Sequence, residues 1–453
     1  MPELLESRNP LTGETVGTVP MTPVEEISGI VARARESLAS WRGIGIRERG
    51  ELLKPAGERL LAEAEEIGIL ITKEMGKTKR SSVAEVSNCG KRFSRAVNEI
   101  VDALRPEEIE DRNTRSTIYY DPFGVCATIA PWNYPVSMAQ WMLLPALIAG
   151  NTIVLKPSEE TPLSGQAYFD ILSAFLPPNV LQIIQGADEA GKALVASDVD
   201  LIAFTGSRAA GKHILAAAAP GLKRVILELG GKDPLVVLAD ADLDAAAKFA
   251  LVSCFENAGQ MCISTERIYV AEEVAGEFER KLVALTADWK VGDGLEEGVR
   301  MGPMVHGQQR DHVLSHIDQA VEQGARVVAG GTGHQDGFVM PTILVDVADD
   351  MDVMQEETFG PVACIRPVTS VDEAVELANK SPYGLGAVVF GRDEDNAMAV
   401  ARRLDAGMIG VNRGCFGASG APWVGAKESG YGFHSSVQGH RQFAQARVVS
   451  RAK

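Results

Sequence analysis

The chain has 453 residues, of which 45% are hydrophobic, and its 44 basic and 61 acidic side chains give a formal charge of −17. At about 150 residues per domain this length predicts roughly three domains. The acidic balance argues against nucleic-acid partners, which need Lys and Arg to neutralise phosphates, and against docking on anionic membranes. Six scattered cysteines without a CxxC pair are not typical of a disulfide scaffold or a zinc ribbon, and we expect a cytoplasmic protein.

The first hundred residues are predicted to be mostly helical. Thr22 to Glu25 reads as a capping box with Pro23 at the first helical position. Further helical patterns cover about 45–73 and 81–104. The segment 114–120, TRSTIYY, is rich in β-formers and reads as an isolated strand.

From residue 124 the pattern changes to short apolar runs that alternate with segments of helix length. The runs span 125–130, 152–156, 180–184 and 201–206. This alternation predicts an α/β fold with a parallel sheet covered on both faces. A second series, with expected strands at 234–239, 267–271, 325–330, 362–368 and 386–391, predicts a second α/β domain. RVVSR, at 447–451, reads as a final strand, and the Gly-rich stretches 330–337 and 414–432 read as loops.

Three side chains are candidates for chemistry. Cys262 lies in a loop with Gly259 and Gln260, where a cysteine is poorly placed to act as a small core residue, although that is the default for a cysteine. Glu228 follows an apolar run, so burial should raise its pKa toward that of a general base; alternatively it caps the next turn. Asn133 lies between two prolines and could donate to a developing oxyanion, or be an ordinary turn residue.

Six motifs occur in an order and at spacings that resemble the aldehyde dehydrogenase superfamily. They are PWNYP, KPSE, FTGS, ELGGKDP, GQMC and EETFGPV, and the resemblance extends from about residue 9 to residue 448. The resemblance implies that Cys262 is the nucleophile, Glu228 the base for hydrolysis and Asn133 the oxyanion donor. It also implies a reaction in which an aldehyde forms a thiohemiacetal and then a thioester on the cysteine.

The same resemblance implies a dinucleotide site. Lys156 and Glu159, with Pro157 and Ser158 between them, match the grip on the adenosine ribose, and Gly206 and Ser207 match the pyrophosphate turn. The other matching cofactor contacts are Trp132, Asn133, Leu229, Glu357 and Phe359. Because Glu159 would repel a 2′-phosphate, we expect NAD as cofactor, with NADP use left open through Lys156 and Ser158.

The substrate is approached through positions that line the tunnel in the family. Trp141 and Glu256 stand where semialdehyde enzymes tend to have arginines, and Trp423 fills an aromatic position similar to amino-aldehyde and betaine-aldehyde members. An acid with aromatic walls suits a cation, so we expect a neutral or cationic aldehyde. Arg413 and Ser419, in the loop that contacts substrate tails, leave succinate semialdehyde as the alternative. Glu256 could instead pair with an arginine.

The family resemblance implies three parts that are not consecutive in the chain. These are a Rossmann-like NAD(P)-binding domain (1–106 and 122–230), a catalytic domain (231–434) and a small β oligomerisation flap (107–121 and 435–453). Flap strands are expected to pair across subunits, which predicts a homodimer or homotetramer. The rival interpretation is a non-catalytic, dinucleotide-binding or structural protein on the same fold.

Overall fold

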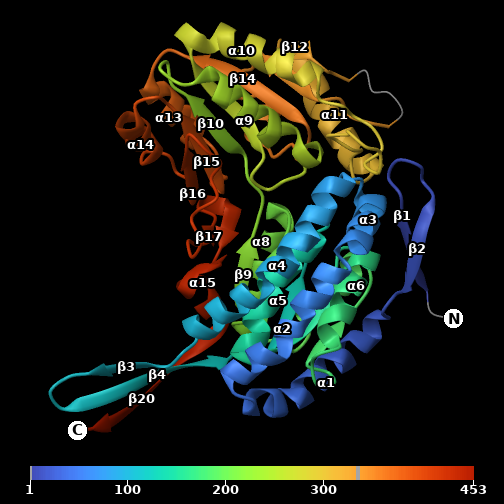
Figure 1. Cartoon of the computed structure of the whole chain (residues 1–453), viewed down its shortest axis with the longest axis vertical. Coiled ribbons are helices and arrows are strands. Elements are labelled where there is room, and N and C mark those ends of the chain that lie inside the picture. Colours follow the sequence, from blue (N-terminus) through green and yellow to red (C-terminus); the bar gives the residue numbers. More distant parts are fainter. Residues whose placement is uncertain (1–2, 333–336) are drawn as a thin grey trace.

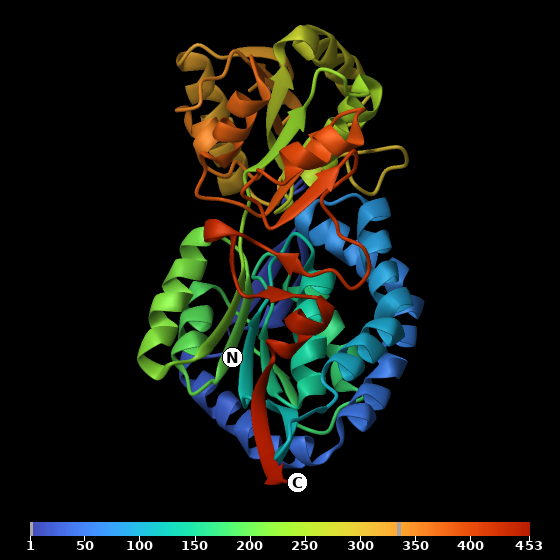
Figure 2. The same cartoon turned by 90° about the vertical axis from the view of Figure 1, so that its left-hand side faces the viewer.

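Two helix-covered sheets form two lobes, from which a narrow third sheet projects (Figures 1 and 2). The computed structural model describes residues 3–332 and 337–453, so the expected loop at 330–337 lies partly outside the described residues. The α/β fold class is confirmed. Within the described ranges, no helix combines the length and hydrophobicity that crossing a bilayer requires.

The first lobe is built on a six-stranded sheet whose strand order is β18-β9-β8-β5-β6-β7. Its strands are β5 (Val125–Ile129), β6 (Thr152–Lys156), β7 (Leu181–Ile183), β8 (Leu201–Thr205), β9 (Arg224–Glu228) and β18 (Gly430–Tyr431). The first five are parallel, and only β18 pairs antiparallel, with β9. The helices between the strands are α5 (Pro135–Ala149), α6 (Pro162–Ser173), α7 (Asp188–Ala196) and α8 (Arg208–Ala218), with the short turn η1 (Ala219–Gly221) after α8. The four predicted strands of this series are confirmed. β5, β6 and β8 are mostly apolar and almost wholly buried, as expected of a parallel sheet covered by helices, whereas β7 at the sheet edge is only partly buried.

An amino-terminal segment of helices packs against this lobe. It consists of α1 (Val24–Gly43), α2 (Ile46–Ala62), α3 (Ala64–Met75) and α4 (Lys79–Ala103). A hairpin of β1 (Leu4–Arg8) and β2 (Thr15–Pro20) precedes it and was not predicted. The capping box is wrong: α1 begins after Pro23 without a side-chain cap. The Thr22 hydroxyl instead accepts a hydrogen bond from the backbone N–H of Gln185, at 3.0 Å.

The second lobe is built on a seven-stranded sheet whose strand order is β12-β13-β14-β11-β10-β15-β16. Its strands are β10 (Asp233–Val237), β11 (Thr265–Ala271), β12 (Arg326–Ala329), β13 (Thr342–Val345), β14 (Val362–Val368), β15 (Gly386–Phe390) and β16 (Met408–Val411). Its helical segments are α9 (Leu243–Phe255), η2 (Glu256–Gly259), α10 (Glu272–Ala287), α11 (Gly307–Glu322), α12 (Asp352–Gln355), α13 (Val371–Asn379) and α14 (Glu394–Ala401). The second predicted series is therefore found, and β13 and β16 add to it.

The projecting sheet joins segments that are distant in the chain. β4 (Thr114–Pro122) lies between β3 (Glu107–Glu110) and β20 (Ala444–Ala452), and both pairings are antiparallel. Figure 1 shows this sheet extending away from the body. The predicted strands 114–120 and 447–451 are thus partners.

The stretch 414–432, expected to be a loop, contains short regular elements. They are β17 (Trp423–Val424), η3 (Lys427–Ser429) and β18, and β19 (Phe433–His434) and α15 (Ser436–Arg441) follow them. β17 pairs with β19, while β18 joins the sheet of the first lobe. This stretch therefore runs from the second lobe back to the first, beside the junction where the chain passes from β9 to β10.

Candidate active site

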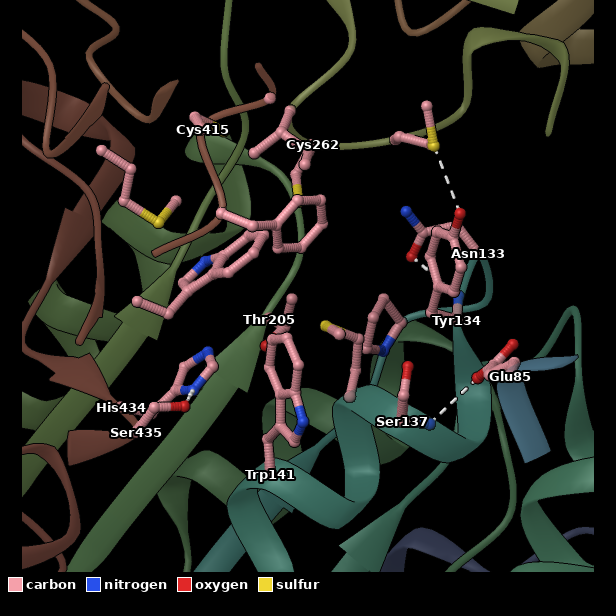
Figure 3. Close-up of a pocket in the computed structure, with 18 of the residues that line it drawn as sticks. Glu85, Asn133, Tyr134, Ser137, Trp141, Thr205, Cys262, Cys415, His434 and Ser435 are labelled. Carbon is pink, nitrogen blue, oxygen red and sulfur yellow. Dashed lines mark hydrogen bonds between the residues drawn. The ribbon is translucent and has the colours of Figure 1, made fainter. Parts of the chain in front are cut away.

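A cavity of about 1090 Å³ lies between the two lobes. Residues from the carboxyl ends of the first lobe's strands line it together with the loop that carries Cys262 (Figure 3). Ligands of parallel α/β sheets bind at this edge. Twelve of the candidate residues line the cavity: Trp132, Asn133, Trp141, Gly206, Ser207, Leu229, Glu256, Cys262, Glu357, Phe359, Ser419 and Trp423.

Cys262 is half-buried in the turn between η2 and β11. Gly259 precedes it with φ +70°, and a Cβ there would lie 2.0 Å from the carbonyl oxygen of Gly360, so only glycine fits. Burial raises the pKa of the Cys262 thiol well above its usual value, and the nearby acids Asp233, Glu357 and Glu228 raise it further. The thiol therefore needs a base before it can act as a nucleophile.

Asn133 ties the first lobe to the cysteine loop. Its side-chain Nδ2 donates to the carbonyl oxygen of Gln260 at 3.0 Å, and its Oδ1 accepts from the N–H of Tyr134 at 3.0 Å. The Tyr134 hydroxyl in turn donates to Met261 Sδ at 3.2 Å. The amide of Asn133 is thus held in one orientation at the wall of the cavity.

Glu228 ends β9 and is 5% exposed. Neither of its carboxyl oxygens has a hydrogen-bond partner among the described residues. Burial raises its pKa well above the usual value for a carboxyl group, and its charge is one of those that raise the pKa of Cys262. The side chain does not line the cavity, although its neighbours Leu229 and Gly230 do. An unsatisfied buried acid is costly for the fold and is typical of a functional site.

The residues expected to hold a dinucleotide form two groups. Ser207 is the N-cap of α8, and its hydroxyl accepts from the N–H of Ala210 at 3.3 Å. A helix N-terminus favours a phosphate, and a Cβ on the preceding Gly206 would lie 2.4 Å from the Phe204 ring. Glu357 accepts from the N–H of Gly231 at 3.0 Å. The Phe359 ring stands perpendicular to Trp132, with centroids 5.5 Å apart. This helix N-terminus, together with an acid and two aromatic rings on the same cavity wall, fits a dinucleotide.

The second group lies outside the cavity, at the end of β6. Lys156 is 4% exposed, and its Nζ lies 3.2 Å from the Glu159 carboxylate and 3.1 Å from the carbonyl oxygen of Pro157. The Ser158 hydroxyl accepts from the N–H of Glu160 at 3.3 Å. Because β6 runs parallel to β5, whose end leads to Asn133, both groups lie at the same edge of the sheet.

Aromatic rings form one wall of the cavity. The Trp141 ring lies 5.3 Å from Trp423 and 4.4 Å from His434, and Phe416 lies 5.4 Å from Trp423. Figure 3 shows Trp141 and His434 near each other. His434 and Trp423 face each other across the β17–β19 pair. Burial lowers the pKa of His434 to about 3, so its ring is neutral. The sequence did not point to His434 because it lies beyond the motifs.

The three polar residues proposed for the substrate pocket differ in their placement. Glu256 is half-buried in the wall, and within residues 3–332 and 337–453 its carboxylate has no hydrogen bond or ion pair. Ser419 is exposed at the rim, and its hydroxyl accepts from Arg95. Arg413 is not brought to the cavity: it is exposed and donates to the carbonyl oxygen of Phe416 at 3.1 Å. The pairing of Glu256 with an arginine is absent from the described part of the chain.

Comparison with known proteins gives the family. The sequence model described as the aldehyde dehydrogenase family matches residues 2–449, and the chain belongs to this family. A mitochondrial succinate-semialdehyde dehydrogenase of Arabidopsis thaliana is 35% identical, over 98% of this chain and 85% of the relative. A peroxisomal aminoaldehyde dehydrogenase of Malus domestica is 38% identical, over 94% of this chain and 88% of the relative.

A solved structure supports the same assignment. Betaine aldehyde dehydrogenase from Staphylococcus aureus, in complex with NAD+, superposes with a TM-score of 0.95 at 31% identity, over 99% of this chain and 92% of that one. The protein is thus an NAD(P)-dependent oxidoreductase that acts on an aldehyde group.

Proposed function

We propose that the protein oxidises its aldehyde through a covalent thioester on Cys262. The observation that carries the proposal is that Cys262 and Asn133 line one cavity, and that the buried acid Glu228 is near enough for its charge to raise the pKa of Cys262. Cys262 Sγ bonds to the carbonyl carbon of the substrate, while Asn133 Nδ2 and the backbone N–H of Cys262 stabilise the oxyanion. Bound NAD(P)+ supplies the acceptor for the hydride.

Glu228 acts as the base for both proton transfers. Its raised pKa matches the need to take a proton from the Cys262 thiol and later from the water that attacks the thioester. Since the carboxyl does not line the cavity, a side-chain rotation brings it to that water. Hydrolysis releases the carboxylic acid and returns the thiol, and the presence of this base favours water over an acyl-accepting thiol.

We further propose that NAD is preferred over NADP. Glu159 is ion-paired with Lys156, and we assign its carboxylate to the ribose hydroxyls because the family resemblance implies that role. Its negative charge would repel a 2′-phosphate, although Lys156 and Ser158 keep some NADP use open.

For the substrate, we propose a neutral or cationic aldehyde, with the cationic type ahead. Glu256, the first residue of η2, brings to the cavity wall a carboxylate that has no hydrogen bond or ion pair among the described residues. A cation bound there would gain a charge partner and the faces of Trp141 and Trp423. A carboxylate would meet repulsion from Glu256 and would not reach Arg413.

A carboxylated semialdehyde is the second candidate, supported by a different observation. Arg92 and Arg95 of α4 line the cavity, and Arg95 reaches Ser419 at the rim. An acidic tail long enough to extend to this rim would find these arginines. The relatives named as succinate-semialdehyde and glutarate-semialdehyde dehydrogenases are consistent with this candidate.

A panel of aldehydes with NAD tests the substrate proposal. Three substrates of equal length, carrying an ammonium, a neutral or a carboxylate tail, are compared by kcat/KM on the wild type and on Glu256→Gln. We expect Glu256→Gln to lower kcat/KM about tenfold for the ammonium substrate only, which corresponds to about 1.4 kcal/mol. Glu273→Gln, on the exposed side of α10, is the control. A lead of more than tenfold for the carboxylated substrate on the wild type would favour the second candidate.

We also propose that the expected domain roles apply. Residues 1–106 with 122–230 bind NAD(P), 231–434 form the catalytic domain, and 107–121 with 435–453 form the oligomerisation flap of a cytoplasmic homodimer or homotetramer. The paired strands β4 and β20 support the flap. For the catalytic role, Cys262→Ala should abolish oxidation and leave NAD binding intact. A wild type that binds NAD tightly but oxidises none of the three substrates would favour the non-catalytic rival.

A further inference from the structure

A buried lysine–glutamate pair holds the turn that carries Asn133. The Glu85 carboxylate accepts from two consecutive backbone N–H groups at the start of α5, those of Val136 at 3.0 Å and Ser137 at 2.9 Å. Figure 3 shows the bond to Ser137. Lys77 forms an ion pair with Glu85 and donates to the carbonyl oxygen of Asn133 at 3.0 Å. The two side chains are 0% and 2% exposed. The carbonyl group of Asn133 and the start of the helix that follows it are therefore both held by this pair.

Lys77 makes one further contact with this turn. Its Nζ lies 4.1 Å from the centroid of the Tyr134 ring, and the Tyr134 hydroxyl bonds to Met261, next to Cys262. The pair thus contacts three consecutive features of the turn: the carbonyl of Asn133, the ring of Tyr134 and, through Glu85, the first turn of α5.

A second buried pair has the same design in the second lobe, where Lys232 precedes β10 and Glu266 is in β11. The Glu266 carboxylate accepts from the consecutive N–H groups of Thr358, at 2.8 Å, and Phe359, at 2.9 Å. Lys232 pairs with Glu266 and donates to the Thr358 hydroxyl at 3.1 Å. These side chains are 0% and 3% exposed. The segment that they fix is the one that presents Glu357 and Phe359 to the cavity.

Neither pair is needed simply to fill the core. Removing two charges from water is expensive, and well-packed apolar residues commonly serve stability as well or better. A fully satisfied buried polar network instead imposes one geometry on the groups that it bonds. In both pairs those groups are the backbone of a segment that lines the cavity.

We propose that the two pairs are positioning residues with separate tasks, an inference that rests on the proposed function of Asn133, Glu357 and Phe359. Lys77–Glu85 orients Asn133 toward the oxyanion and so acts on the chemical step. Lys232–Glu266 orients Glu357 and Phe359 toward the nicotinamide ribose and so acts on cofactor binding. Variants of Lys77–Glu85 should therefore change mainly kcat, and variants of Lys232–Glu266 should change mainly the affinity for the cofactor.

The test compares Lys77→Met and Glu85→Gln with Lys232→Met and Glu266→Gln in the full-length enzyme. Steady-state kinetics give kcat and KM, and NADH fluorescence gives the Kd of the cofactor. We expect the first two to lower kcat at least tenfold with the NADH Kd within threefold of wild type. We expect the second two to raise the NADH Kd at least tenfold. Glu85→Gln should be milder than Lys77→Met because the amide oxygen can still accept from α5.

Two exposed pairs supply matched controls. Lys79, which is on α4 like Glu85, pairs with Glu65 of α3, and Lys281 pairs with Asp244 in the second lobe. Lys79→Met and Lys281→Met should leave both readouts within twofold of wild type. If Lys77→Met or Lys232→Met does not fold, the double variants Lys77→Met/Glu85→Gln and Lys232→Met/Glu266→Gln, which leave no unpaired charge, give the same comparison.

The outcomes distinguish this inference from the function on which it rests. Asn133→Ala and Glu357→Gln are measured alongside. If Asn133→Ala keeps its kcat and Glu357→Gln keeps its Kd, the proposed roles of those residues fail. Suppose instead that Asn133→Ala loses kcat and Glu357→Gln binds NADH more weakly, while the lysine–glutamate pair variants behave like the controls. The positioning proposal is then overturned, and it is also overturned if the variants of both pairs change kcat and the NADH Kd alike.

Discussion

The side chain of Asn133 is hydrogen-bonded to the carbonyl oxygen of Gln260, with 3.0 Å between Nδ2 and the oxygen. This contact links the turn after β5 to the loop of Cys262. Gln260 is itself anchored, since its Oε1 accepts from the N–H of Val305 at 2.9 Å. The site is therefore preorganised across the two lobes, which is the condition under which a hydrogen-bond donor stabilises a transition state well.

The buried carboxyl group of Glu228 is predicted to lower the free energy of unfolding of the protein. Its pKa is higher in the folded protein than its usual value of 4.5, so the native state binds more protons and stability falls as the pH rises above that value. Glu228→Gln removes this penalty, which for an unsatisfied buried group is about 1–3 kcal/mol. Thermal unfolding should give the variant a higher Tm than wild type at pH 8 and a smaller difference at pH 5. If the Tm of Glu228→Gln at pH 8 were equal to or lower than that of wild type, Glu228 would not be the unsatisfied buried acid described above.

Glu159 is predicted to set the cofactor preference. Replacing it with glutamine removes the charge that opposes a 2′-phosphate while leaving Lys156 in place. The ratio of kcat/KM for NADP to that for NAD should rise about tenfold. Glu189→Gln, an exposed change on α7, serves as the control. A wild type that prefers NADP at least tenfold would refute the prediction.

The strands of the projecting sheet correspond to runs that stand out in the sequence, but their pairing depends on contacts between distant residues. TRSTIYY and RVVSR are rich in β-formers, so β4 and β20 could be predicted individually, whereas their partnership brings Ser116 opposite Ser450. The same limit explains the missed amino-terminal hairpin. Its strands are short and polar, and Ser7 is held by a hydrogen bond to Glu74, 67 residues away.

The exposed apolar residues of the projecting sheet lead to a prediction about assembly. Ile109 and Val448 are 58% and 61% exposed, and exposed strands of this kind pair with another chain unless they are covered. The mass measured by light scattering should be that of a dimer or tetramer, and Val448→Asp should shift the equilibrium toward monomer. Leu222→Asp, at a residue 90% exposed in the first lobe, should change nothing. A monomeric wild type would refute the oligomer.

Motif spacing predicted twelve of the residues that line the cavity, because the motifs lie at strand ends that a parallel sheet brings to one edge. It could not predict that Arg413 faces solvent, since its orientation depends on a local bond to Phe416. It also missed the Lys77–Glu85 pair. One signal was present: Glu85 lies on the buried face of α4 with Val86 and Cys89, and an acid in such a face needs a buried partner.

The covalent role of Cys262, with Glu228 as the base for hydrolysis, is tested most directly by intact-mass spectrometry of Glu228→Gln mixed with NAD+ and a good aldehyde. Loss of the hydrolytic base should trap the acyl group, giving a burst of about one NADH per subunit and an acyl mass that maps to Cys262. Continued NADH formation at the wild-type rate, with no mass added to Cys262, would contradict the proposed mechanism.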